Sequence, residues 1–380
     1  MRTVIAIDSF KGSLSSLEAG RAASEGIKRV YTDADIKIFP LADGGEGTVE
    51  AIVCATDGEL VKAEVTAPLG DKVIAEYGIV NGKTAVIEMA AAAGITLVLP
   101  EKRNPLRTTT YGVGELILDA IKRGCRDFII GIGGSATNDG GIGMLSALGY
   151  KFLDKEGKCV SVFGKGLADI ISISTEGREK ELSECRFRVA CDVTNPLCGE
   201  LGCSAIYGPQ KGATPETVRD MDSWLSHLAA LTEKTLKTSF ADLPGAGAAG
   251  GLGFAFVSYL SGELVSGIDL VTEAIGLEEH MRSADLVITG EGRLDGQSAM
   301  GKAPVGVARL AKRHGITVLA FSGAVTPDAA RNNSEGIDAF FPIVRAPVAL
   351  AEAMDKTNAE RNMKDTVEQA IRLYRVTKCK

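Results

Sequence analysis

Five loops along the chain carry glycine or an acidic side chain, and each of them follows an apolar run. They are DSFKGS (8–13), ADGGEG (42–47), GIGGSATNDGG (131–141), CDVTNP (191–196) and TGEGRLDGQS (289–298). In parallel α/β sheets, ligands bind at the carboxyl ends of strands, where helix N-termini offer backbone N–H groups to anions. One acidic strand end is an ordinary helix cap, but five together predict a binding site for a charged ligand.

The loop from Gly131 to Gly143 contains six glycines between an apolar strand and a helix. Glycine loses conformational entropy on folding, so the backbone there needs a positive φ or a close approach. Gly131, Gly133 and Ala136 fit the dinucleotide fingerprint, but a polar segment intervenes and no acid ends a second strand about twenty residues on. A Walker lysine is also absent. This leaves a cradle for phosphate or carboxylate oxygens, built from backbone N–H groups with Ser135 and Thr137.

Phosphoryl transfer needs such a cradle, cations for the phosphates, Mg²⁺ held by carboxylates and a group that orients the attacking hydroxyl. Lys11, Lys211 and Lys302 each lie in a glycine-containing loop, although any one of them alone would pass for a solvated surface lysine. The loops also supply enough carboxylates for one metal ion and one base: Asp43, Glu46, Asp139, Asp192, Glu291 and Asp295.

The elements that must position these loops follow two patterns. Buried, parallel-type strands are expected near both ends of the chain, whereas residues 61–99 read as antiparallel strands with a hairpin turn at Asn81-Gly82. We therefore predict an α/β fold with two domains: a discontinuous Rossmann-like parallel-sheet domain (1–72 and 262–380) and an inserted α/β domain with hairpins (73–261). The active site is expected in the cleft between them.

Composition narrows the function classes. The net charge of −7 and the pI of about 5.3 disfavour a nucleic-acid or membrane-surface role. The first apolar run ends at Asp8, so no signal peptide is expected. The eight cysteines form no Cys-x-x-Cys pair. Reduced thiols in the cytoplasm are therefore favoured over a zinc site around Cys191 to Cys203.

Seven ordered motifs span essentially the whole chain. They are DSFKGSL (8–14), LADGGEGT (41–48), GGSATNDGG (133–141), CDVTNPL (191–197), YGPQKGA (207–213), GAGAAGGLG (245–253) and ADLVITGEGRLDGQSAMGKAP (284–304). Together they closely resemble the motifs of bacterial glycerate kinases of the two-domain, type-1 family. One departure is Cys203, where the family leads us to expect alanine. The resemblance implies phosphorylation of D-glycerate with ATP and Mg²⁺, and a Rossmann-like domain beside a second α/β domain.

The loops and the resemblance together predict particular roles. The predicted catalytic residues are Asp192, as general base or metal ligand, with Lys11 and Asp295. The predicted substrate- and phosphate-binding residues are Ser9, Lys11, Gly133, Gly134, Ser135, Thr137, Asn138, Asn195, Lys211, Glu291 and Lys302. The predicted metal ligands are Asp43, Asp139 and Glu291.

The expected product is 2-phosphoglycerate, with phosphorylation at the 3-hydroxyl as the alternative. Two other classes stay open at this point: a non-catalytic glycerate sensor and an NAD-dependent 2-hydroxy acid dehydrogenase. No nucleic-acid or membrane partner is expected. The sequence leaves the oligomeric state open, with a homodimer as one option.

Overall fold

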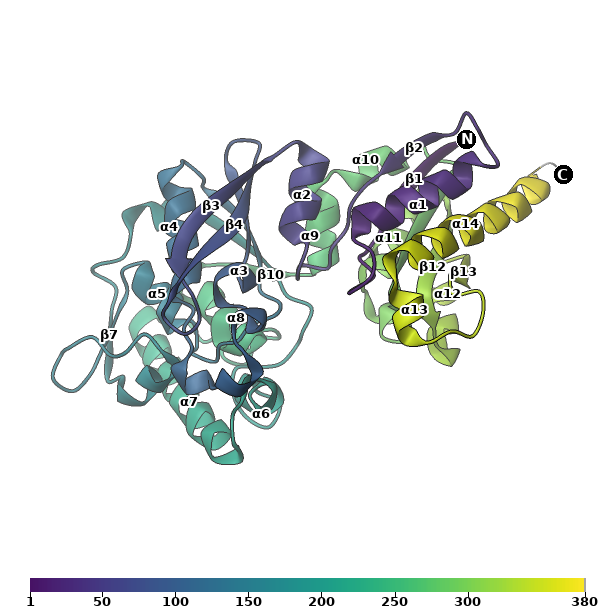
Figure 1. Ribbon diagram of the computed structural model, residues 1–380. Helices are drawn as coiled ribbons and strands as arrows, with labels where there is room; N and C mark the ends of the chain where they lie inside the picture. Colours follow the sequence, from purple (N-terminus) through teal and green to yellow (C-terminus); the bar gives the residue numbers. More distant parts are fainter. Residues whose placement is uncertain (379–380) are drawn as a thin grey trace. The chain divides into compact units, whose positions relative to one another are not determined.

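The computed structural model describes residues 1–378, and the chain divides into two compact units (Figure 1). Unit 1 comprises Met1–Asp43, Glu50–Thr56 and the chain from Ile268 on. Unit 2 comprises Gly44–Val49 and Asp57–Gly267. Both units mix helices with sheets, so the predicted α/β class is confirmed. The division differs from the predicted boundaries at residues 44–49, 57–72 and 262–267, which all belong to unit 2. At 57–72 the reason is that β3 (Glu59–Thr66) pairs with β4 (Lys72–Val80) inside the sheet of unit 2.

Unit 1 is built on a five-stranded sheet with the order β13-β12-β11-β1-β2, and every neighbouring pair is parallel. Its strands are β1 (Arg2–Ile7), β2 (Asp35–Ile38), β11 (Leu286–Leu294), β12 (Thr317–Val325) and β13 (Ala339–Pro342). After Arg2, every residue of β1 is buried, as expected for a central parallel strand covered on both faces.

Helices accompany this sheet. They are α1 (Ser16–Lys28), α2 (Thr48–Thr56), α9 (Gly267–Ala274), α10 (Leu277–Met281), α11 (Ala303–Lys312), α12 (Arg331–Ser334), α13 (Leu350–Met354) and α14 (Lys356–Lys378). Helix α1 begins with a capping box, because Ser15 and Glu18 satisfy each other's backbone N–H groups. Helix α14 packs against α1, and Gly26 makes the close approach possible: a Cβ there would lie 2.5 Å from the backbone oxygen of Lys364.

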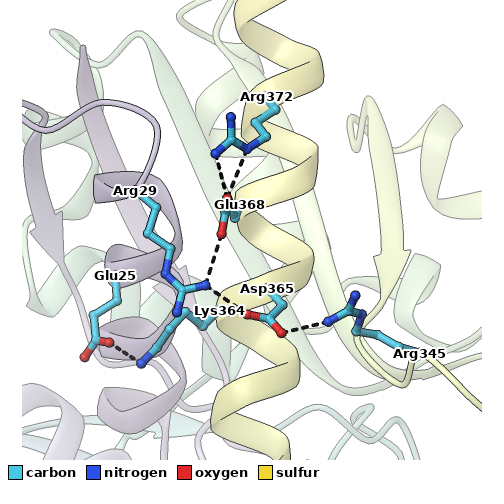
Figure 2. Close-up of polar contacts among 7 residues, drawn as sticks. All are labelled: Glu25, Arg29, Arg345, Lys364, Asp365, Glu368 and Arg372. Atoms are coloured by element: carbon cyan, nitrogen blue, oxygen red, sulfur yellow. Dashed lines mark hydrogen bonds and ion pairs between the residues drawn. The ribbon is translucent and has the colours of Figure 1, made fainter.

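Charged side chains border the α1–α14 contact (Figure 2). The Nη1 atom of Arg29 on α1's C-terminal side lies 2.9 Å from Asp365 Oδ1 and 3.0 Å from Glu368 Oε2 on α14. Arg345 also pairs with Asp365, and Arg372 also pairs with Glu368. Lys364 pairs with Glu25. Isolated surface pairs contribute little to stability. The apolar side chains beneath, such as Ile27 and Val367, therefore supply most of the stability of this contact.

Unit 2 contains a six-stranded mixed sheet with the order β10-β9-β6-β5-β4-β3. Its further strands are β5 (Thr84–Glu88), β6 (Asp127–Gly131), β9 (Arg186–Ala190) and β10 (Glu263–Val265), and β7 (Lys151–Leu153) pairs with β8 (Ser172–Ser174) separately. Strands β5, β6, β9 and β10 are parallel, whereas β3, β4 and β5 are antiparallel. Asn81 and Gly82 take positive φ between β4 and β5, which confirms the predicted hairpin.

The helices of unit 2 are α3 (Ala90–Ala93), α4 (Tyr111–Lys122), α5 (Ile142–Ala147), α6 (Cys203–Tyr207), α7 (Pro215–Leu236) and α8 (Ala248–Leu260). Short 3₁₀ helices complete the chain: η1 (Ile95–Leu97), η2 (Pro100–Lys102), η3 (Pro105–Arg107), η4 (Gly164–Asp169), η5 (Lys180–Glu184), η6 (Pro209–Lys211), η7 (Ser298–Met300) and η8 (Pro327–Ala330). Within residues 1–378, none of the helices is both long and apolar enough to span a membrane.

Candidate active site

The sheet of unit 1 reverses its winding direction between β1 and β11. The chain goes from β1 through α1 to β2 on one side of the sheet, and from β11 through α11 to β12 on the other. The crevice at such a topological switch point is where open α/β sheets bind ligands. The last pair of β1 with β11 joins Ile7 and Gly290. Asp8 and Glu291 come directly after that pair, so two carboxylates lie at the switch point.

A cavity of about 620 Å³ opens at these strand ends. Its lining includes six residues that the sequence singled out: Ser9, Lys11, Asp43, Glu291, Asp295 and Lys302. The structure therefore brings together, within unit 1, the predicted residues from three motifs that are far apart in the chain. Roles for the individual side chains stay predictions.

Two buried carboxyl groups dominate the electrostatics of this cavity. Burial, with repulsion from Asp43, raises the pKa of Asp8 to about 6. Burial likewise raises the pKa of Glu291 to about 7, although the Ser298 hydroxyl donates a hydrogen bond to it and Lys302 attracts it. Such groups gain from a bound cation, because a neighbouring positive charge favours the ionised carboxylate.

Asp8 is the functional candidate that the sequence analysis did not select. It lies in the motif DSFKGS, but only Ser9 and Lys11 of that motif were assigned roles. The available signal was its place directly after a buried strand, which is the same signal that selected Asp192.

Asp295 has a structural function that its sequence context did not reveal. Its Oδ1 accepts hydrogen bonds from the backbone N–H groups of Gln297 (2.9 Å) and Ser298 (3.2 Å). Its Oδ2 lies 3.6 Å from Nε of Arg293. Asp295 therefore caps the turn that leads into η7, and its predicted catalytic role is not favoured by this geometry.

The donor set of the cavity suits a hard divalent cation. Mg²⁺ takes oxygen ligands and is usually bound through one or two carboxylates together with substrate phosphates. Across residues 1–378, no three His, Cys, Asp or Glu side chains lie close enough to hold an ion by themselves. Asp8, Asp43 and Glu291 line the cavity and offer such carboxylate oxygens, so these residues fit Mg²⁺ bound together with substrate phosphates.

The glycine-rich loop of unit 2 is mostly buried. Gly133 and Gly134 are exposed, but the side chains from Ser135 to Asp139 are buried. Gly134 has a φ of +74°, which favours glycine. Only the start of the predicted cradle, at Gly133 and Gly134, is therefore open to a ligand.

Lys211 anchors this loop instead of extending into solvent. It is 2% exposed, and its Nζ donates hydrogen bonds to Ser135 Oγ (2.7 Å) and to the Thr137 carbonyl oxygen (2.6 Å). Burial lowers the pKa of Lys211 to about 8. This geometry does not favour direct phosphate binding by Lys211 and Thr137, because both lie inside the protein and the lysine holds the loop in place.

Asp139 and Asn138 are also internal. The Asp139 carboxylate is fully buried and accepts hydrogen bonds from the N–H and hydroxyl of Thr110 (both 2.8 Å), and from the N–H groups of Gly141 (3.1 Å) and Gly143 (3.3 Å). Asn138 donates to Ser204 Oγ at 2.8 Å. This geometry does not favour Asp139 as a metal ligand or Asn138 as a substrate ligand, because both side chains bind other parts of unit 2.

The second glycine-rich stretch explains why the first one is so poor in side chains. Ala249, Gly250 and Gly251 all take positive φ and kink α8. A Cβ on Gly250 would lie 2.2 Å from the Thr137 carbonyl oxygen, and one on Gly251 would lie 2.8 Å from Gly140 Cα. The segment that approaches the glycines after Ser135 is therefore another glycine-rich loop of the protein.

The motif CDVTNP divides into an accessible carboxylate and a structural amide. Asp192 is exposed, and its Oδ1 accepts a hydrogen bond of 2.9 Å from the N–H of Gly267. Asn195 donates to the Leu201 carbonyl oxygen (2.8 Å) and accepts from the Tyr207 hydroxyl (2.6 Å). Asn195 therefore shapes its loop, which does not favour the predicted contact with substrate.

One further carboxylate was missed. Glu88 ends β5, and its Oε1 accepts a hydrogen bond of 2.8 Å from the N–H of Val49. Backbone hydrogen bonds from Gly47 and Thr48 also act on this group. Glu88 thus anchors the loop ADGGEG from within unit 2. The sequence signal was a single acid at the end of an apolar run.

Comparisons with known proteins agree over nearly the whole chain. A family model described as the glycerate kinase family matches residues 3–375. A glycerate kinase from Haemophilus influenzae is 50% identical over 374 residues, which is 98% of both chains. A glycerate 2-kinase from Escherichia coli is 48% identical and covers 98% of this chain and 99% of its own. The crystal structure of a provisionally assigned glycerate kinase 2 from Salmonella typhimurium LT2 is 46% identical, covers 100% of both chains and superposes with a TM-score of 0.91.

Unit 1 has carboxylates and lysines around a cavity at the ends of parallel strands. These are components that phosphoryl transfer requires. The relatives place this chain among the kinases. The chain belongs to the glycerate kinase family. The sequence had left two other classes open, a non-catalytic sensor and a dehydrogenase. Family membership favours a kinase over both of them.

Proposed function

We propose that the enzyme transfers the γ-phosphoryl group of ATP to the 2-hydroxyl of D-glycerate, giving 2-phosphoglycerate and ADP. The observation that carries this proposal is the cavity at the switch point of unit 1, where Asp8 and Glu291 lie with Lys11 and Lys302. The choice of the 2-hydroxyl is supported by the name of the E. coli relative, a glycerate 2-kinase. We further propose a cytoplasmic location.

In this proposal, the side chains of the cavity bind and orient the phosphates. Lys11 and Lys302 supply positive charge to phosphoryl oxygens, and Asp8, Asp43 and Glu291 would hold Mg²⁺. When bound, the ion would neutralise part of the charge that develops on the phosphates. The glycerate oxygen forms the new P–O bond, the bond from the γ-phosphorus to the bridging oxygen breaks, and ADP leaves.

The hydroxyl proton needs an acceptor. Asp192 stays the proposed general base, because it is an exposed carboxylate at the end of β9. Gly133 and Gly134 stay proposed as contacts for anionic oxygens, since their backbone is exposed. In the same proposal, Lys211 and Ser135 act indirectly by holding this part of the loop.

A coupled assay tests the position of phosphorylation. Enolase accepts 2-phosphoglycerate directly, whereas 3-phosphoglycerate first needs a mutase. With D-glycerate, MgATP and enolase but no mutase, we expect phosphoenolpyruvate to appear at the rate at which ADP forms. If ADP forms without phosphoenolpyruvate, and phosphoenolpyruvate appears only after the mutase is added, the enzyme phosphorylates the 3-hydroxyl instead.

A further inference from the structure

The cavity of unit 1 has two chemically different parts. One part carries the charged groups, among them Asp8, Glu291 and Lys302. The other is apolar and consists of the segment after β13 together with α13, including Ile343, Leu350, Ala353 and Met354. A ligand that fills this cavity must therefore combine a strongly charged end with an apolar surface.

The apolar part is accessible and is held close to the charged loop. Leu350 lines the cavity although 74% of the residue is exposed, so a bound molecule could cover much of its side chain. Met354 reaches the loop that carries Lys11, because a Cβ on Gly12 would lie 3.0 Å from the Met354 Cε atom. Gly12 has a φ of +77°, which suits glycine and keeps this approach open.

Glycerate does not match this division. It is a three-carbon acid with a polar group on every carbon, so it would leave the apolar part uncovered. The volume of about 620 Å³ lies within the range of about 300–1,000 Å³ typical of sites for much larger ligands. A nucleotide has the required combination, with a flat aromatic base at one end and a polyphosphate at the other.

We propose that this cavity is the nucleotide site, with a purine base against the apolar surface of Leu350, Ala353 and Met354 and the polyphosphate toward Lys11 and Lys302. The inference deepens the proposed function, because it assigns ATP rather than glycerate to unit 1. Its position at the switch point of a parallel sheet agrees with the way such sheets bind mononucleotides. The anionic glycerate is then left to residues outside this cavity.

The test separates recognition of the base from recognition of the phosphates. Titration calorimetry would measure binding of MgADP and of magnesium tripolyphosphate, which lacks the base, to the wild type and to Leu350→Asn. The substitution removes apolar surface without adding charge. We expect MgADP to bind about tenfold more weakly, from the apolar area left uncovered, and tripolyphosphate binding to change less than twofold.

Leu373→Asn is the matched control, since Leu373 on α14 is 61% exposed in the same unit and does not line the cavity. It should leave both affinities unchanged. In steady-state assays, Leu350→Asn should raise the KM for ATP about tenfold and leave the KM for glycerate within twofold.

Unchanged MgADP affinity in Leu350→Asn, or a raised KM for glycerate alone, would overturn the assignment. Equal weakening of MgADP and tripolyphosphate would also overturn it, because the apolar surface would then not contact the base. Calorimetry needs no turnover. Failure to phosphorylate glycerate would therefore refute the proposed function, while the MgADP titration would still decide whether the cavity binds a nucleotide.

Discussion

Replacing Glu291 with glutamine is expected to stabilise the ligand-free enzyme at alkaline pH while it reduces activity. Glu291 is 8% exposed, and its pKa rises from the ordinary 4.5 to about 7 on folding. Burial is the main cause, and repulsion from Asp8 and Asp295 adds to it. Glutamine has nearly the same shape, and its side-chain oxygen can still accept the Ser298 hydrogen bond.

The sign follows from proton binding. Between pH 4.5 and about 7, the folded protein retains a proton on Glu291 that the unfolded chain has lost, so the stability from this group falls as pH rises through that interval. The pKa difference corresponds to about 3 kcal/mol once the group is fully ionised in both states. Glu291→Gln should therefore gain about 2–3 kcal/mol more over wild type at pH 8 than at pH 5.

Urea denaturation followed by far-UV circular dichroism, without nucleotide or Mg²⁺, would measure this difference at pH 5 and pH 8. Glu279→Gln is a suitable control, because Glu279 is exposed in the same unit. Turnover of Glu291→Gln should fall by at least about 10²-fold if the carboxylate is needed for the transferring phosphoryl group. If Glu291→Gln and wild type differ in stability by the same amount at pH 5 and pH 8, the reasoning is refuted, because ionising the buried Glu291 would then not destabilise the fold.

Three further outcomes are expected. If Asp192 is the general base, Asp192→Asn should lower kcat by about 10²–10⁴ with little change in the melting temperature. A loss of about 1 kcal/mol in stability, with turnover within about threefold of wild type, would instead show that Asp192 only caps Gly267. Gly140→Val should lower the melting temperature, because Gly140 has a φ of +61° and an added Cβ would lie 2.8 Å from side-chain atoms of Leu225 and Leu228. An unchanged melting temperature would contradict this expectation. Arg29→Met should lower the urea midpoint of unfolding at low salt, and lower it less in 1 M NaCl, because it removes the ion pairs with Asp365 and Glu368. A salt-independent loss would exclude an electrostatic origin.

The carboxyl ends of strands were the part of the site that the sequence revealed best. Buried strands can be recognised from their apolar runs, and the first polar residue after each run marks the sheet edge. Asp43 and Glu291 were predicted as carboxylates in loops at strand ends, and Lys11 and Lys302 as lysines in glycine-containing loops. All four line one cavity. Asp8 follows β1 directly and lines the same cavity, but it was not among the predicted site residues.

The glycine-rich loop shows what the same reasoning leaves undecided. A single sequence does not show whether a polar side chain faces a ligand or another loop of the protein. Lys211, Thr137, Asn138 and Asp139 are buried by contacts with segments distant in sequence. Those contacts follow from the sheet order and from the kink in α8, and neither is encoded in the local pattern of residues.

The position of β3 was missed for a related reason. Its apolar runs were recognised as antiparallel, but the boundary at residue 72 separated it from β4. A hairpin connection makes two strands neighbours in one sheet. The eight-residue register from Glu59 to Thr66 against β4 therefore places it in unit 2.

The order of strands in unit 1 also constrains how the protein is made. On a ribosome, β1 emerges first, yet its partner β11 follows only after all of unit 2 has been synthesised. At about 5–20 residues per second, β1 therefore waits for tens of seconds with one of its edges unpaired. Unit 2 has its last strand, β10, by residue 265, so it can complete its sheet while unit 1 cannot. The exposed edge of β1 is thus a transient aggregation risk during synthesis.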